Sequence, residues 1–233
     1  MSNHTPREAI LIGATGLVGQ TLLAILAQDY AKVTVIARRK PSTIAPNIDA
    51  HVLKDFAGLK DLLATLALDA NTDAFSCLGT TRKAAGSAER FRQIDYGYNL
   101  AFAQACRAQG IERFFLLSAM NANASSPLLY PRVKGELEQA VQTLGFADVV
   151  MFRPSLLLGQ HDDRPLEALA QTVFSKIKPF LPKQWQQAAL RPIEAERVAQ
   201  AMAQTSQTLP VQSRKAATAR VHIIDNTQML AIT

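Results

Sequence analysis

The sequence is poor in cysteine and histidine, the residues from which disulfide frameworks and most zinc centres are built. Its two cysteines, Cys77 and Cys106, lie far apart and form no CxxC pair, which suits two reduced, packed thiols better than a disulfide or a zinc site. The four histidines are scattered without the spacing of metal ligands. Two aspartates follow His161, and an acidic loop explains them better than a cation site. We therefore predict no bound metal.

Long apolar runs are also missing. No run reaches the ~18 residues that a membrane span needs, and residues 1–8 lack the apolar block of a secretory signal. The sequence therefore predicts a cytoplasmic protein with no membrane partner.

Positive charge is in excess, but it is not clustered. The formal net charge is +6 and the isoelectric point is near 9.5, yet no run of lysine or arginine is interleaved with aromatic residues. We therefore expect no nucleic-acid partner. A basic pocket for a phosphorylated cofactor would account for part of the surplus.

The sequence does contain a regular alternation of apolar strands and amphipathic helices. Its 233 residues, 48% of them hydrophobic, fit one globular unit with a substantial core. After a first strand at residues 8–12, strands are expected at 32–37, 50–53, 73–78, 113–118 and 148–152. Helices are expected between them at 17–28, 59–68, 88–109 and 134–144. This order predicts an α/β fold of the Rossmann type, a doubly wound parallel sheet with helices on both faces.

The alternation weakens after Pro154. Residues 155–192 are rich in proline, contain the only tryptophan, Trp185, and include a helical patch at residues 166–177. We interpret this segment as a small C-terminal substrate cap, inserted before a last helix at 193–204 and a last strand at 220–224. The predicted organisation is a single domain over residues 1–233 with a Rossmann core over residues 7–154. Apolar residues of the segment would line the cap or pack in the core: Leu156, Phe174, Phe180 and Trp185.

The most informative motif is the glycine triplet after the first strand. Gly13, Gly16 and Gly19 are spaced three residues apart, and apolar residues at helical spacing follow them. A Cβ at Gly13 or Gly16 would block a tight turn and the approach of the backbone to phosphates, and Gly19 allows helix and strand to pack closely. Amides at the helix N-terminus would then face a dinucleotide pyrophosphate. The predicted contacts are Gly13, Thr15, Gly16, Leu17, Val18 and Gly19.

The end of the second strand indicates which dinucleotide is bound. NAD-binding folds usually place an acidic residue there, whereas this chain has Arg38 and Arg39. A guanidinium offers a planar fork of donors to a 2′-phosphate and stacks on adenine, so we predict NADP(H). The alternative is that both arginines are solvated surface residues. Asp55, just beyond the third strand, is a candidate for the adenine edge or else a surface loop residue.

Tyr130 and Lys134 form a YxxxK pair, and a separation of four brings both side chains to one face of a helix. The ordinary pKa of tyrosine is about 10, and a nearby ammonium in a low-dielectric cleft lowers it. Tyr130 would then exchange a proton with a substrate oxygen while hydride moves at the nicotinamide. Ser118, at the end of the preceding strand, would orient the substrate carbonyl. Pro131 disfavours a helical Tyr130, so the helix is expected to start either at Pro131 or near residues 126–127.

Together these residues resemble the short-chain dehydrogenase/reductase superfamily in its atypical, NmrA-like branch. Four blocks more narrowly resemble the Tat-interacting oxidoreductase-like family: residues 77–82 (CLGTTR), 116–118 (LLS), 130–138 (YPRVKGELE) and 152–159 (FRPSLLLG). The match runs in order from about residue 8 to residue 180. The resemblance implies NADPH bound across residues 13–19, Arg38 and Arg39. It also implies that the rest of the cofactor is contacted by Leu78, Gly79, Thr80, Lys134 and Pro154.

Two departures from the family pattern bear on activity. Related sequences often carry paired serines where this chain has Ser118-Ala119, and Asp95 stands roughly where many dehydrogenases keep an asparagine of a proton relay. Two readings therefore stay open. The first is an NADPH-dependent reductase of a small carbonyl compound that uses Tyr130, Lys134 and Ser118. The second is an NADPH-binding redox-sensing protein with a regulatory protein partner and no turnover. Epimerase or dehydratase chemistry on nucleotide sugars is less favoured, because the substrate region is short.

Overall fold

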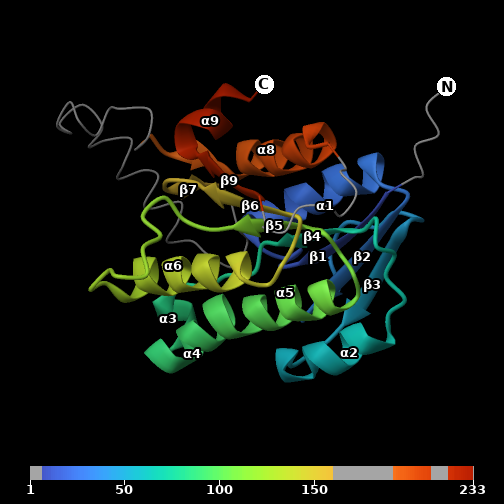
Figure 1. Ribbon diagram of the computed structural model, residues 1–233, viewed down its shortest axis with the longest axis horizontal. Coiled ribbons are helices and arrows are strands. Elements are labelled where there is room, and N and C mark those ends of the chain that lie inside the picture. The colour runs from blue at the N-terminus through green and yellow to red at the C-terminus, as the bar shows by residue number, and fades with distance from the viewer. Residues whose placement is uncertain (1–6, 160–190, 211–219, 233) are drawn as a thin grey trace.

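A seven-stranded parallel sheet forms the centre of the molecule (Figure 1). The computed structural model describes residues 7–159, 191–210 and 220–232. The strand order is β3-β2-β1-β4-β5-β6-β9, and every neighbouring pair is parallel. The strands are β1 (Glu8–Ile12), β2 (Lys32–Ala37), β3 (Ile48–Val52), β4 (Asp73–Ser76), β5 (Arg113–Leu117), β6 (Asp148–Arg153) and β9 (Arg220–Asp225). The doubly wound parallel sheet predicted from the sequence is confirmed.

Helices cover both faces of the sheet (Figure 1). One face carries α1 (Leu17–Asp29), α8 (Ala195–Thr208) and α9 (Asn226–Ala231), with α1 packed along α8. The other face carries α2 (Leu59–Thr65), α5 (Asn99–Ala108) and α6 (Leu129–Gln142), with shorter turns at η1 (Phe56–Gly58), α3 (Arg82–Ala85), α4 (Ala88–Arg92) and η2 (Gln93–Tyr98). Because side chains alternate across a strand, Phe114 and Phe115 enter the two separate cores. Such two-sided burial explains why inner strands such as β1 and β5 are nearly continuously apolar.

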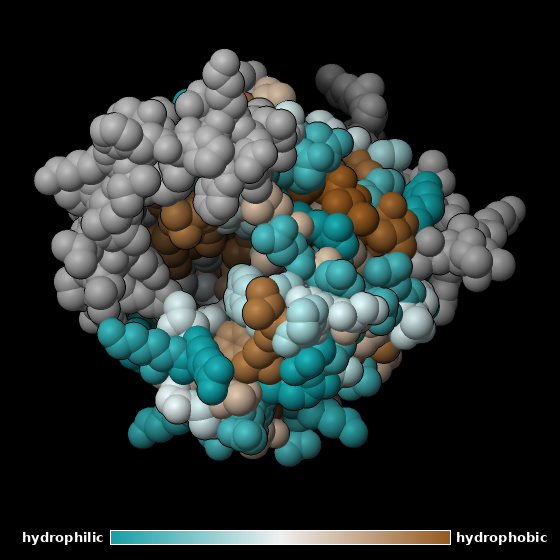
Figure 2. Space-filling model, turned by 90° about the vertical axis from the view of Figure 1, so that its left-hand side faces the viewer, coloured by the Kyte–Doolittle hydropathy of each residue, from teal (hydrophilic) through white to brown (hydrophobic). Residues whose placement is uncertain are grey.

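The direction in which the chain adds strands reverses between β1 and β4. From β1 the chain winds outward to β2 and β3 and then returns to pair β4 on the other side of β1. Ligands of open α/β sheets bind beyond the carboxyl ends of the strands at such a reversal. Figure 2 looks onto that side of the molecule, where the surface is hollowed and hydrophobic residues lie within the hollow.

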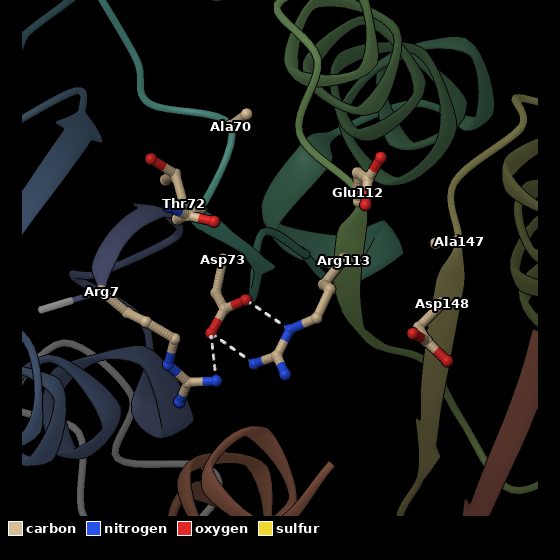
Figure 3. Close-up of a pocket in the computed structure, with 9 residues that line it drawn as sticks. Arg7, Ala70, Thr72, Asp73, Glu112, Arg113, Ala147 and Asp148 are labelled. Atoms are coloured by element: carbon tan, nitrogen blue, oxygen red, sulfur yellow. Dashed lines mark hydrogen bonds and ion pairs between the residues drawn. The ribbon is translucent and has the colours of Figure 1, made fainter. Parts of the chain in front are cut away.

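The amino ends of the strands carry a buried ion-pair network instead. Asp73, at the start of β4, accepts bonds of 2.6 Å from Nε and Nη2 of Arg113 at the start of β5. Figure 3 shows Arg7 and Arg113 directed at the Asp73 carboxylate from two sides. The Tyr30 hydroxyl donates to Asp73 at 2.6 Å, and Arg113 also donates to the Ser206 carbonyl oxygen of α8. The network therefore ties the sheet to the end of α8.

Several short elements were not anticipated, and the start of one helix differs from both expectations. β7 (Leu157–Leu158) and β8 (Ile193–Glu194) form a two-residue parallel pair, and α9 follows β9. α6 begins at Leu129, between the two predicted starts. Pro131 is the third residue of α6, where a backbone N–H would have no intrahelical acceptor, so the proline removes no hydrogen bond.

Several sequence predictions fall on other residues. Most of the predicted cap, including Phe174, Phe180 and Trp185, lies outside the described residues, and the single-domain division stays a prediction. Within the described part of the chain, no helix is long and apolar enough to cross a bilayer. The same residues contain no group of three or more side chains arranged to hold a metal ion.

Candidate nucleotide-binding and catalytic site

The glycine loop between β1 and α1 has the geometry of a phosphate cradle. Gly13 has a φ of +81°, and a Cβ there would lie 2.4 Å from the carbonyl carbon of Cys77. A Cβ at Gly19 would lie 2.1 Å from the Gly13 carbonyl oxygen, and one at Gly16 would lie 3.2 Å from that oxygen. α1 then begins at Leu17, so its first amides open onto the loop. Side chains are therefore excluded where a pyrophosphate would meet the backbone.

The residues that follow β4 form the second wall of the site. Cys77 continues the sheet pairing through its N–H, which donates to the Ile12 carbonyl oxygen at 3.0 Å. Leu78 is buried, whereas Gly79 is exposed and its Cα lies beside the Lys134 ammonium, 3.7 Å from where a Cβ would be. Leu78, Gly79 and Thr80 thus lie between the glycine loop and Lys134, and their contact with the cofactor stays a prediction.

Lys134 is buried and paired with a carboxylate. Its Nζ lies 3.0 Å from Oδ1 of Asp95, and Oδ2 of Asp95 accepts a bond of 2.8 Å from the Thr80 amide. Burial alone would lower the pKa of Lys134, but Asp95 and Tyr130 more than offset it, so this pKa lies above its ordinary value. Burial raises the pKa of the neighbouring Cys77 thiol to about 12. Lys134 is therefore an ammonium beside a neutral thiol.

Asn99 is a positioning residue that belongs to none of the motifs found in the sequence. Its side-chain amide donates to the carbonyl oxygens of Leu78, Ile94 and Asp95 at 3.0–3.2 Å. Its Oδ1 accepts a bond of 2.5 Å from the Ser76 hydroxyl. These bonds join the end of β4 to η2, a π-helical turn in which a wider spacing replaces the usual helical hydrogen bonds. Asp95 projects from this turn, so Asn99 holds the carboxylate that pairs with Lys134.

Tyr130 lies on the exposed side of the site. It is the second residue of α6, one turn before Lys134, and 47% of its surface is exposed. Its ring contacts Phe91 of α4 with 5.9 Å between ring centroids. The YxxxK pair therefore combines a solvent-accessible hydroxyl with a buried ammonium on the same helix.

The Ser118 hydroxyl is hydrogen-bonded to a carboxylate within the protein. Its buried hydroxyl donates to Oε1 of Glu138 at 2.5 Å, and Glu138 is also held by Nε and Nη2 of Arg153 at 3.0 and 2.5 Å. Because its proton is used by Glu138, the Ser118 hydroxyl can only accept a further hydrogen bond in this arrangement. In this arrangement Ser118 has no proton to donate to a substrate carbonyl, which the predicted orienting role would require. Pro154, next to Arg153, accepts a bond from the Met120 amide at 2.9 Å, which fixes the strand-end segment.

Arg38, Arg39 and Asp55 lie at the ends of β2 and β3. Both arginines are exposed, and Arg38 lines a cleft together with Asp55 and Leu78. Asp55 caps η1 by accepting from the Ala57 amide at 3.0 Å, and it also accepts from the Tyr98 hydroxyl at 3.2 Å. These two bonds lower the pKa of Asp55, so it stays a carboxylate. The structure brings the predicted adenosine residues to the same end of the sheet as the glycine loop.

With this geometry in view, comparison with known sequences identifies the family. Residues 9–181 match the NAD dependent epimerase/dehydratase family. The chain belongs to this family. Protein HTATIP2 of Rattus norvegicus is 38% identical over 185 residues, which is 77% of this chain and 73% of the rat protein. The mitochondrial protein FMP52 of Candida albicans is 35% identical over 195 residues, which is 82% of this chain and 84% of the relative. The resemblance to the Tat-interacting, atypical short-chain dehydrogenase/reductase branch is confirmed.

Solved structures support the same fold. MoeE5 in complex with UDP-glucose and NAD has a TM-score of 0.64 at 16% identity and covers 94% of this chain and 76% of its own. A short-chain dehydrogenase/reductase family oxidoreductase from Burkholderia thailandensis has a TM-score of 0.65 at 18% identity and covers 97% of this chain and 94% of its own. At these identities the likeness shows the Rossmann fold alone.

The predicted cytoplasmic location is wrong by this comparison. Curated relatives from Scheffersomyces stipitis, Candida albicans and Aspergillus fumigatus are named as mitochondrial proteins. The prediction failed because it relied on missing membrane and secretory signals, and those absences do not distinguish the cytosol from an organelle.

The residues present fit a nicotinamide dinucleotide. Gly13, Gly16 and Gly19 leave room for a pyrophosphate, and the Lys134 ammonium lies beside Gly79 and is held by Asp95. NAD(P) binding is shared with the family. The preference for NADP over NAD stays a prediction.

Proposed function

We propose that this chain is an NADP(H)-dependent reductase of a small carbonyl compound, with Tyr130 and Lys134 as its catalytic pair. One observation carries the proposal: a buried ammonium on α6 lies beside the glycine-lined wall of the cofactor site, one turn from an exposed tyrosine hydroxyl. This arrangement places a proton donor at the site's surface and a fixed positive charge behind it.

The choice of NADP(H) follows from the residues at the end of β2. Arg38 and Arg39 occupy the position at which an NAD-specific fold presents a carboxylate to the ribose hydroxyls. Guanidinium groups attract the 2′-phosphate that a carboxylate would repel. NADPH should therefore bind more tightly than NADH, and replacing Arg38 and Arg39 together with alanine should erase the difference.

The chain's own groups would divide the work as follows. When bound, a nicotinamide supplies or accepts the hydride. Tyr130 donates a proton to the carbonyl oxygen during reduction. Lys134, kept charged by Asp95, binds the ribose hydroxyls and stabilises the negative charge that develops on the Tyr130 oxygen. Asn99 and the Thr80 amide keep Asp95, and through it Lys134, in place.

The Tyr130→Phe variant tests the catalytic assignment. Removing one hydroxyl should lower kcat for a panel of small aldehydes and ketones by at least ~100-fold, while NADPH affinity changes less than about twofold. Tyr96→Phe is a matched control, since it also removes one tyrosine hydroxyl. The Tyr96 ring lies under the Arg92 guanidinium, with 4.8 Å between the guanidinium carbon and the ring centroid. Reduction at the parent rate by the Tyr130 variant would eliminate the proposal.

A second function, NADPH-dependent regulation without turnover, is favoured by two observations. The Ser118 hydroxyl is already donated to Glu138, and the charge of Lys134 is balanced by Asp95. Both features reduce the catalytic power of the site without weakening cofactor binding. On this reading the parent protein would reduce no member of the carbonyl panel, and a protein partner would bind it with different affinity in NADPH and in NADP+.

A further inference from the structure

Two further cations, Lys54 and Arg90, lie near Arg38 on elements outside the predicted motifs. A cleft opens beyond the ends of β2, β3 and β4. It is lined by Arg38, directly after β2, by Lys54 of the loop that follows β3, and by Arg90 of α4. Asp55 and Tyr98 complete its polar lining.

The cations of this cleft have few partners within the protein. Among residues 7–159, 191–210 and 220–232, neither Arg38 nor Lys54 makes a hydrogen bond or an ion pair. Arg90 donates from Nη1 only to neutral oxygens, at 2.7 Å to Gln93 and 3.2 Å to the Tyr98 hydroxyl. These contacts orient the Arg90 side chain, whose positive charge also acts on the nearby Asp55 carboxylate.

The single carboxylate of the cleft is already used. Asp55 accepts from the Ala57 amide and from the Tyr98 hydroxyl, and Tyr98 packs edge-on against Phe56 with 5.5 Å between ring centroids. Three cations and one carboxylate leave the cleft with an excess of two positive charges. A phosphate monoester carries about two negative charges at neutral pH, so its charge matches this excess.

We propose that Lys54 and Arg90, together with Arg38, form the binding site for the 2′-phosphate of a phosphorylated adenosine, and that Arg90 is a specificity-determining residue. The inference rests on the proposed NADP(H) function and extends it to residues outside the β2 end. Arg90 comes from the helix that leads into η2, the turn that carries Asp95.

Arg92 provides a matched control on the same helix. Its guanidinium pairs with Glu136 of α6 and lies 4.8 Å from the centroid of the Tyr96 ring, and it does not line the cleft. Replacing Arg92 with alanine removes the same charge from the same helix as Arg90→Ala. A difference in ligand affinity between the two variants would therefore come from the position of the lost guanidinium and not from the change in net charge.

The experiment is calorimetric titration of the full chain with two probes that lack nicotinamide, adenosine 2′,5′-bisphosphate and adenosine 5′-monophosphate. Arg90→Ala and Lys54→Ala should each weaken binding of the bisphosphate by about tenfold and change binding of the monophosphate by less than about twofold. Arg92→Ala should leave both affinities unchanged. Arg90→Lys should restore part of the loss, because it restores the charge without the planar fork.

The outcomes separate this inference from the proposed function. If Arg38→Ala abolishes the preference for the bisphosphate while Arg90→Ala and Lys54→Ala keep it, this inference fails and the NADP(H) assignment stands. Equal loss of both probes in Arg90→Ala would also overturn it, since Arg90 would then contact adenine or ribose. A parent protein that does not distinguish the two probes would overturn both assignments.

Discussion

The two ends of the central sheet carry the same kinds of charged residue, but two cations at the carboxyl ends lack the carboxylate partner that their counterparts at the amino ends have. At the amino ends, Asp73 is held by Arg113 and Asp148 by Arg220. At the carboxyl ends, Arg38 and Lys54 have no such partner among the described residues. A charge that is already compensated contributes to structure, whereas one held in place without a counterion is available to a ligand. Two other cations at the carboxyl ends are paired, Lys134 with Asp95 and Arg153 with Glu138.

The largest effect should come from breaking the buried pair at the amino ends. Asp73→Asn leaves the Arg113 guanidinium buried without a counterion and should reduce the free energy of unfolding by about 3–5 kcal/mol. Urea denaturation measures this loss. NADPH affinity below the transition should change less than about twofold, because the network lies at the opposite end of the sheet.

A surface pair serves as the control. Asp49 lies 3.7 Å from Lys32 with both side chains about half exposed, so Asp49→Asn should cost at most about 0.5 kcal/mol. Equal losses for Asp73→Asn and Asp49→Asn would show that burial at the amino ends adds nothing to the pair.

The next largest effect should come from replacing Gly13, and a matched glycine separates backbone strain from the loss of the phosphate cradle. Gly13 and Gly86 have nearly the same φ, +81° and +82°, but a Cβ would collide with Cys77 at Gly13 and would meet nothing within 4 Å at Gly86. Gly13→Ala should weaken NADPH binding by at least ~100-fold, equivalent to ~2.7 kcal/mol, as measured by calorimetry. Gly86→Ala should cost about 1 kcal/mol of stability and leave NADPH affinity unchanged. Tight NADPH binding by a folded Gly13→Ala protein would contradict the assigned cradle.

The smallest effect concerns acid stability. Burial alone would raise the pKa of Asp148. Hydrogen bonds and charges from Arg220 and His222 lower this pKa by more than burial raises it, so it lies below its ordinary value. A carboxylate with a depressed pKa stabilises the fold above its unfolded pKa of about 3.9, and this stability is lost as the pH falls through the lower folded value. Unfolding free energy should therefore decrease below about pH 4, and Asp148→Asn should make the decrease shallower. An identical acid profile in parent and variant would assign the effect to other carboxylates.

The alternating apolar segments were sufficient to predict the sheet. β1 and β2 have the predicted bounds, 8–12 and 32–37, and the remaining long strands differ by one or two residues at their ends. Such segments are specified locally, because near-continuous Val, Ile, Leu and Phe suits a strand buried on both faces wherever the chain runs. β7 and β8 were missed because a two-residue pair has too few residues to show a pattern, and its pairing joins residues far apart in the chain.

The site was only partly predictable. Tyr130 and Lys134 share a helix face because of their spacing, and the glycine loop opens a helix as its motif indicates. The partners of these residues could not be read from spacing. Asp95 lies on a π-helical turn that brings it to Lys134. Glu138 lies on α6 and accepts a hydrogen bond from Ser118, which follows β5.

The amino-acid sequence by itself determined the parallel Rossmann sheet, the glycine cradle and the one-turn spacing of Tyr130 and Lys134, because each depends on residue types at short separations along the chain. The tertiary structure alone decided which charges are compensated. Asp95 is paired with Lys134 and Glu138 with Arg153, while Arg38 and Lys54 share a cleft with Arg90. Whether an ionised group meets a counterion or a ligand depends on contacts between distant segments and on burial, and only the folded chain brings these together.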